Sequence, residues 1–453
     1  MTASASAPAP LPPAHPEEIA LDACAALRAD VAAQTADAAA SGSPPQVPPP
    51  GADPVESWLL LVLTVERAAQ LPPRARAAHF RAARSVWDDA ADACEAPRYA
   101  AVGARLSRWR AADPTLPLVR DLLWVFEQAE GAGFTRLALA GYAALGHLVP
   151  ADDVRRGYVL AQSARAARTL GHLEAARERY EYSEWLGARH RDRWLRARSR
   201  LGLGGAYRQI GNYAAMRESL HGVLRAGVPD PRLIAAAHHG LVLGAIAASD
   251  WDVAIAHGWH LLRAARRGAI PRADALLLMA SVCRRIGRYR AARSAALAAL
   301  RHCVLPEDPL VAHRLLVEVA LDSGDRAAAI THVDALKRLV GGAAGPYEDA
   351  KALRAIGLSE ERWGRRDRAL AAVTDALTLA RAHRFHELVF EMEPLIERIR
   401  ARRAGHVRSG TAAAGGAARP NPANDVQVSP MSRRILARVL AVDTAAVPPV
   451  GAP

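Results

Sequence analysis

The sequence predicts an all-α protein built from repeated pairs of helices, and three observations carry this prediction. Residues 56–400 place apolar side chains at helical spacing almost throughout, and no alternating strand pattern is sustained. Of the 453 residues, 51% are hydrophobic but only 5% are aromatic, which favours helices packed through small side chains over a β-sandwich or barrel. A small turn residue recurs every 37 to 40 positions, namely Gly133, Gly171, Gly211, Ser249, Gly287, Gly324 and Gly364.

Each period repeats the same local pattern around its turn. Five positions after the turn stands a small or unbranched residue: Ala138, Ala176, Met216, Ala254, Ala292, Ala329 and Ala369. Apolar residues follow at the spacing of one helical face, as in Ala369, Val373 and Leu377. Glycine at the turn accepts a positive φ and ends the first helix, while the small residue lets the second helix approach it. The pattern predicts a right-handed α-solenoid of about seven antiparallel helix pairs.

Residues 203–216 (LGGAYRQIGNYAAM) resemble the core of a tetratricopeptide repeat. Leu203, Gly204, Tyr207 and Gly211 fall on the family's large, small, large and turn positions, whereas Met216 replaces the usual alanine. Two further matches are Met279-Ala280 with Cys283, Gly287, Tyr289 and Ala292, and Ile356-Gly357 with Gly364 and Ala369. The resemblance covers about residues 120–390, but the period is near 38 rather than 34 and most units lack the helix-closing proline. It implies that the first helices line a concave wall, which binds a peptide or helix of a partner.

Four segments follow from this pattern. Residues 1–55 are rich in Ala, Pro and Ser, and we predict a disordered extension. Residues 56–112 are out of register with the array, so we predict a helical N-terminal capping region; its helical stretches are Val55–Gln70, Arg74–Cys94 and Arg98–Ala111. The repeat array then occupies 113–400, and a flexible basic tail occupies 401–453.

The tail contains one short amphipathic helix near residues 430–440. Ser429 is a typical N-cap before Pro430, and the apolar stripe consists of Ile435, Leu436, Val439 and Leu440. Such a helix either packs back on the array or docks on a partner; both are favoured over binding at a membrane surface, which usually needs a longer apolar face.

The net charge of +13 is weak evidence for nucleic-acid binding. All but two of the 59 basic residues are arginine, the exceptions being Lys337 and Lys351, and acids are interspersed with them through residues 60–400. A nucleic-acid surface would concentrate its charge, so this partner is unlikely on the sequence. The best apolar run, Trp58–Val65, falls far short of the roughly 20 residues that a membrane span needs, and we expect a cytoplasmic protein.

The search for catalytic or metal-binding motifs finds little. There is no phosphate-binding P-loop and no nucleophile elbow, and the four cysteines form no CxxC pair. His257 with His260, and His383 with His386, each offer at most half of a zinc site, so we interpret them as chance pairs on solvated helix faces. Cys283 occupies a core position of its repeat. The sequence therefore predicts a protein that is not an enzyme and needs no cofactor or metal.

The candidate partner-binding residues are arginines at wall-facing positions of the first helices. Counting back from each turn residue collects Arg165, Arg168, Arg208, Arg284, Arg285, Arg314, Arg354 and Arg362. Fewer acids share these positions: Glu127, Glu130, Glu318, Asp322 and Glu361. Because a guanidinium group matches a carboxylate in geometry, the predicted partner is an acidic peptide or a C-terminal carboxylate. The alternative is that these arginines simply pair with neighbouring acids.

The predicted function is therefore a non-catalytic scaffold or adaptor for protein–protein interaction. Besides an enzyme built on a helical toroid, for which the sequence shows no convergent set of acids or histidines, two alternatives remain open at this point. One is a regulatory or sensory module of a bacterial signalling or transcription-control system that acts through a separate protein. The other is a helical-repeat RNA binder, although the recurring polar pair that such a protein needs is not visible in this sequence.

Overall fold

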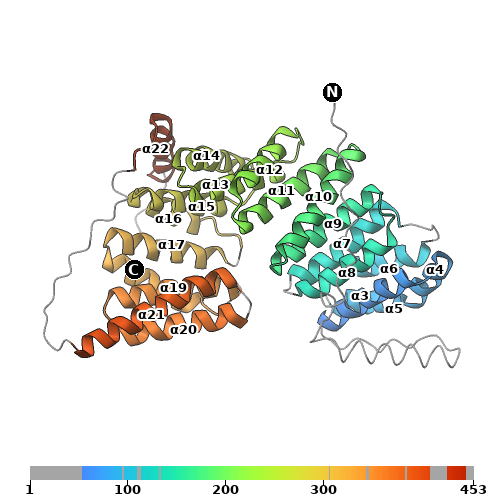
Figure 1. Cartoon of the computed structure of the whole chain (residues 1–453), viewed down its shortest axis with the longest axis horizontal. Coiled ribbons are helices and arrows are strands. Elements are labelled where there is room, and N and C mark those ends of the chain that lie inside the picture. Colours follow the sequence, from blue (N-terminus) through green and yellow to red (C-terminus); the bar gives the residue numbers. More distant parts are fainter. Residues whose placement is uncertain are drawn as a thin grey trace, which may run out of the picture. The chain divides into compact units, whose positions relative to one another are not determined.

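The computed structural model describes residues 54–93, 96–109, 114–131, 134–305, 307–342, 346–382, 385–408 and 426–444. Twenty helices and no strands occur in these residues, which confirms the all-α prediction. The chain divides into two compact units, Met1–Leu233 and Ile234–Pro453, each described here by itself (Figure 1). Nearly all of the predicted extension 1–55, the turn residue Gly133 and most of the predicted flexible tail lie outside the described residues.

The first unit begins with four helices that precede the repeats. They are α3 (Pro54–Gln70), α4 (Pro73–Ala82), α5 (Arg84–Ala93) and α6 (Arg98–Arg108). The prediction of a single helix over Arg74–Cys94 is thus wrong, because α4 ends at Ala82 and α5 begins at Arg84, with Ala83 between them. This break lets α4 and α5 pack against α6 as separate helices. Three pairs follow: α7 (Leu116–Gly131) with α8 (Thr135–Leu148), α9 (Val154–Thr169) with α10 (Leu173–Arg189), and α11 (Arg193–Ile210) with α12 (Tyr213–Arg225).

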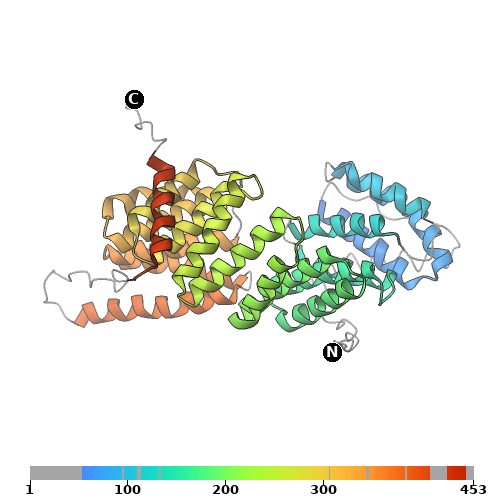
Figure 2. The same ribbon diagram turned by 90° about the horizontal axis from the view of Figure 1, so that it is seen from above.

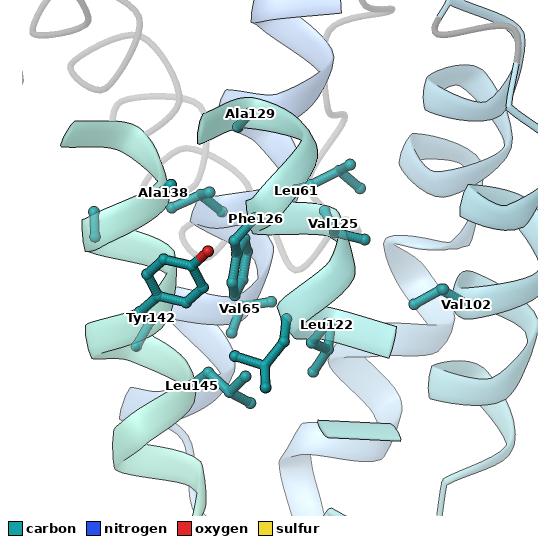
Figure 3. Packing of buried hydrophobic residues seen from close by; sticks show 14 of the residues in the cluster. Leu61, Val65, Val102, Leu122, Val125, Phe126, Ala129, Ala138, Tyr142 and Leu145 are labelled. Carbon is teal, nitrogen blue, oxygen red and sulfur yellow. The ribbon is translucent and has the colours of Figure 1, made fainter. Parts of the chain in front are cut away.

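The core of the first unit runs without interruption from α3 into the first repeats. Figure 3 shows Leu61 and Val65 of α3 beside Phe126 of α7 and Tyr142 of α8. The rings of Phe126 and Tyr142 meet edge to face, with their centroids 5.6 Å apart. The helices that precede the repeats therefore share one continuous core with the first helix pair, and the capping role of residues 56–112 stays a prediction.

The second unit contains most of α13 (Pro231–Ala247) and the helices after it. These are α14 (Trp251–Arg266), α15 (Arg272–Arg285), α16 (Tyr289–Leu300), α17 (Asp308–Ser323), α18 (Arg326–Leu339), α19 (Pro346–Arg362), α20 (Arg366–Ala382), α21 (His386–Arg408) and α22 (Pro430–Thr444). Helices α7 to α20 make seven consecutive pairs, which is the predicted number. Helix α21 packs on α19 and α20 at the end of the array.

The structure confirms the predicted register of the repeats. Positive φ angles occur at Gly171, Gly211, Gly287, Gly324 and Gly364, and at Ser249, where φ is 55°. At three of these turns the next residue caps the second helix, because the side chains of Asn212, Asp250 and Asp325 each accept a hydrogen bond from a backbone N–H three residues on. The small residues of the pattern are all fully buried: Ala138, Ala176, Met216, Ala254, Ala292, Ala329 and Ala369.

Helix α22 forms where the sequence predicts a helix, and it packs back on the array. It contacts α14 and α16 (Figures 1 and 2). Val428, Ile435 and Leu436 are buried in the same cluster as the core residues of these helices. At the start of α22, Asp252 Oδ1 accepts hydrogen bonds from the Ser429 N–H (2.9 Å) and the Ser432 hydroxyl (2.5 Å). Of the two interpretations of the tail helix, the structure therefore supports the one in which this helix packs back on the array.

Candidate functional site

All eight predicted arginines lie on first helices of the pairs. Arg165 and Arg168 belong to α9 and Arg208 to α11, while the second unit carries Arg284 and Arg285 on α15, Arg314 on α17, and Arg354 and Arg362 on α19. Successive first helices touch one another, α7 with α9 and α9 with α11, then α15 with α17 and α17 with α19. We call the surface formed by these arginines and the acids between them the first-helix face of each unit.

In the first unit, Arg165 is neutralised by acids of the preceding first helix. Its Nη2 lies 3.0 Å from Glu130 Oε2 and 3.9 Å from Glu127 Oε1. Glu127 also accepts a hydrogen bond from Gln162 at 2.6 Å, and Tyr142 donates one to Glu130 at 3.2 Å. Burial raises the pKa of Glu130 against the opposing effect of Arg165. The acids predicted for the amino end of the wall are thus the partners of Arg165.

The other two predicted site arginines of the first unit, Arg168 and Arg208, have no ion pair with an acid among the described residues. Arg168 is half-buried between α9 and α11, and its guanidinium lies close to Gly205 and interacts with Tyr180. Arg208 is half-buried near the end of α11 and has no ion pair within the described part of the chain. Arg208 is therefore a predicted site residue whose charge is not neutralised by an ion pair in the described part of this unit.

In the second unit, alternating charges connect three first helices. Arg284 binds two acids of α17: its Nη1 lies 2.8 Å from Glu318 Oε2, and its Nε lies 2.8 Å from Asp322 Oδ2. Arg314 lies 3.2 Å from Glu318 Oε1 and 3.7 Å from Glu348 of α19. The Lys351 ammonium continues the chain at 3.0 Å from Glu348 Oε1.

Glu318 is the central acid of this network. Its burial alone would raise its pKa, but the guanidinium groups of Arg314, Arg284 and Arg354 outweigh burial and hold the pKa below its ordinary value. The carboxylate therefore stays ionised between its cationic neighbours. Glu318 therefore holds first helices together, and the charges of its partners Arg284 and Arg314 are already neutralised by the protein.

The end of the array continues the same pairing. Arg354 lies 3.4 Å from Glu391 of α21, and Arg398 of α21 lies 3.1 Å from Glu361 of α19. By contrast, Arg285 and Arg362 are exposed in the last turns of α15 and α19, and neither has an ion pair within the described residues. Pairing with neighbouring acids, the alternative left open by the sequence, thus holds for Arg165, Arg284, Arg314 and Arg354.

The structure offers little support for other chemistry. Among the described residues, no group of three or more His, Cys, Asp or Glu side chains converges on one point where it could hold a metal ion. Burial raises the pKa of Cys283 to about 12, so this thiol is a core residue, as predicted. In the part of the chain that the structure describes, no helix has both the length and the apolar character for a membrane span.

Sequence reasoning missed two contacts between histidines of paired helices. His238 of α13 meets His257 of α14 with an Nδ1–Nδ1 distance of 3.0 Å, and His313 of α17 meets His332 of α18 at 3.2 Å. The signal was present in the repeat register, since both pairs span 19 residues across a turn. Spacing along a single helix, as in His257 with His260 or His383 with His386, gives no sign of such contacts, and His383 lies outside the described residues.

The packing and register of the helix pairs define the class of protein: a helical-repeat protein with a tetratricopeptide-like fold. No protein-family model matches the chain, and no curated protein matches its sequence. A tetratricopeptide repeat protein from Parabacteroides merdae is 15% identical, with 60% of this chain and 98% of that chain covered and a TM-score of 0.44. A Rap protein complexed with Competence and Sporulation Factor is 12% identical and has a TM-score of 0.44; the match covers 76% of this chain and 98% of that chain. A chain of the APC/C hetero-tetramer Cut9–Hcn1 is 13% identical and has a TM-score of 0.34; the match covers 86% of this chain and 90% of that chain.

Proposed function

We propose that this protein is a non-catalytic scaffold that binds a segment of another protein on the first-helix face. The observation that carries the proposal is the split between paired and unpaired arginines on this face. Arg284 and Arg314 are held in the network with Glu318, whereas Arg285 and Arg362 remain exposed without an ion pair in the described chain. Both unpaired residues stand two positions before a turn glycine, so they occupy equivalent places in their repeats.

The matching ligand is an acidic peptide or the C-terminal carboxylate of a partner. Each exposed guanidinium offers a planar fork that pairs with a carboxylate through two hydrogen bonds. The paired network contributes little net attraction, because each of its cations lies beside a carboxylate of the protein. We expect binding to be governed by Arg285 and Arg362 in the second unit, and Arg208 is the candidate cation of the first unit.

The direct test is the binding of labelled peptides followed by fluorescence anisotropy. The probes are a glutamate-rich decapeptide with a free carboxyl terminus, its amidated form, and a glutamine version without negative charge. The acidic peptide should bind the wild-type protein, and its affinity should fall at least tenfold in the double variant Arg285→Glu, Arg362→Glu. Binding should also weaken as salt concentration rises, because the cations are exposed.

A matched control comes from the second helices of the same repeats. Arg290 of α16 and Arg368 of α20 are exposed as well, so the variant Arg290→Glu, Arg368→Glu changes the net charge equally. Equal loss of peptide binding in both variants would show that only net charge matters and would refute the first-helix face. Tighter binding of an oligouridylate of the same charge than of the peptide would favour the RNA-binding alternative instead.

A further inference from the structure

The two histidine pairs of the second unit occupy the same place in their repeats. One member lies on the first helix, eleven residues before the turn residue, and the other lies on the second helix, eight residues after it. In α13 and α14 these are His238 and His257, and in α17 and α18 they are His313 and His332. All four side chains are half-buried, so each pair lies between two helices at the protein surface.

The other two helix pairs of the second unit fill the same place with apolar side chains. In α15 and α16 the equivalent residues are Leu276 and Ala295, both buried in the core cluster. In α19 and α20 they are Leu353 and Ala372. An aliphatic pair therefore suffices to pack the two helices of a repeat. Two imidazoles with facing ring nitrogens are therefore not required by the fold, and they add nitrogen donors that the two aliphatic pairs of this unit lack.

The geometry of the facing nitrogens suits a transition metal ion. Zinc binds histidine nitrogen at about 2.0–2.1 Å, so two ligands of a tetrahedral site stand roughly 3.3 Å apart. The observed Nδ1–Nδ1 distances of 3.0 and 3.2 Å are within a few tenths of an ångström of this spacing. We propose that each histidine pair binds a divalent transition metal ion of the zinc, nickel or copper class through its two Nδ1 atoms.

Water completes the coordination in this proposal, because no third His, Cys, Asp or Glu of the described chain converges with either pair. Without metal, one Nδ1 of a neutral pair carries a proton and donates it to the other. Metal binding requires a lone pair on both Nδ1 atoms, so that proton leaves to solvent while the Nε2 atom of the same ring takes one up. The exchange releases no net proton, and the bound ion connects the first helix of a pair to the second.

The surroundings of the two pairs predict which site is tighter. At the first pair, the ring of His260 stacks on His238 with centroids 4.6 Å apart and planes inclined by 4°, so a third imidazole lies nearby. At the second pair, the charge of Arg338 acts on His313 and that of Arg293 on His332, opposed by Asp325. Two guanidinium groups repel a divalent cation more than one carboxylate attracts it. The pair on α13 and α14 therefore binds metal more tightly than the pair on α17 and α18.

The test is a titration of the full-length, untagged protein with Zn²⁺ by isothermal calorimetry at pH 7.5. We expect two sites of different affinity. His257→Gln should remove the tighter site and His332→Gln the weaker one, while His239→Gln, an exposed neighbour on α13, should leave both. Cu²⁺ bound to the wild-type protein should show nitrogen hyperfine splitting in its EPR spectrum, reduced in the double variant His257→Gln, His332→Gln.

Several outcomes would overturn the proposal. One is an absence of Zn²⁺ binding up to millimolar concentration, and another is a stoichiometry that the double variant leaves unchanged. If His239→Gln reduces Zn²⁺ binding as much as the variants of the two pairs do, the binding is adventitious and involves surface histidines in general. Circular dichroism verifies that each variant folds, and His238→Gln replaces His257→Gln if the latter does not. Added Zn²⁺ should raise the melting temperature of the wild-type protein but not that of the double variant, because a ligand bound only to the native state stabilises it.

Discussion

Truncation of one side chain of α22 tests whether this helix is part of the folded array. Leu436 is only 6% exposed and belongs to the core cluster of α14 to α16, whereas Met431 on the same helix is 63% exposed. We therefore compare Leu436→Ala with Met431→Ala. The two changes remove similar apolar volume from neighbouring turns of one helix, but only the first removes it from a buried site.

The expected magnitude follows from the carbon atoms that leave the core. Leu436→Ala removes three buried carbons, which corresponds to about 2–3 kcal/mol of the free energy of unfolding once the residual cavity is included. Met431→Ala should change it by less than about 0.5 kcal/mol. The decrease in the free energy of unfolding caused by Leu436→Ala cannot exceed the free energy by which α22 binds to the array. Once α22 has detached, truncating its side chains further does not change the stability of the array. Deletion of residues 426–453 measures that limit.

The assay is urea unfolding followed by tryptophan fluorescence. Trp251 and Trp259 of α14 are partly buried against the cluster that α22 covers, so their emission reports on this contact. Hydrogen exchange of the α22 amides provides a second readout, since weaker docking must speed their exchange. If Leu436→Ala and Met431→Ala have equal effects, or if the deletion leaves the stability of the second unit unchanged, the packing argument is refuted.

Three further predictions concern single residues. Ser249→Gly should stabilise the protein by about 0.5–1 kcal/mol in thermal unfolding. Ser249 has a φ of 55°, whereas the other described turn residues of the repeat register are glycines, which adopt positive φ without strain. A destabilised variant would contradict this prediction. Arg284→Glu should destabilise by about 2 kcal/mol or more in urea, since it places a third acid beside Glu318 and Asp322, whereas Arg285→Glu should have little effect. For His332, burial and the nearby His313 and Arg293 lower the pKa in the folded protein to about 4, below the unfolded value of 6.5. The free energy of unfolding should therefore decrease as pH falls from 6.5 towards 4. His332→Gln should flatten this pH dependence, and an unchanged slope would contradict the prediction.

The repeat register could be predicted because it depends on local chemistry. The positive φ angles at Gly171, Gly287 and Gly324 follow from the need to end one helix and begin the next within a few residues. The buried small residues follow from the close approach of paired helices. The helix break at Ala83 could not be predicted in this way, because no proline or glycine stands there and the break depends on how α4 and α5 pack against α6.

The candidate site was predicted as a set of positions, but its ion pairs were not. Arg284 and Glu318 are 34 residues apart in the sequence, and their contact depends on how α15 and α17 are aligned along their axes. Helical periodicity places a residue on a face but does not say which residue of the next helix lies opposite. The histidine pairs have the same origin, since the contact between His238 and His257 joins two helices across a turn.

The neighbouring residues Arg284 and Arg285 show why charge counting alone cannot locate a binding site in this protein. The two side chains leave their helix about 100° apart. The guanidinium of Arg284 reaches both Glu318 and Asp322, which stand four positions apart on α17, so it holds α15 and α17 in one relative alignment. A shift of α17 by one residue would break both contacts, which makes Arg284 a determinant of how the repeats stack. Arg285 makes no such contact in the described chain and costs the fold little when it changes. Its charge is therefore not neutralised by an ion pair within the described residues, in contrast to the charge of its neighbour.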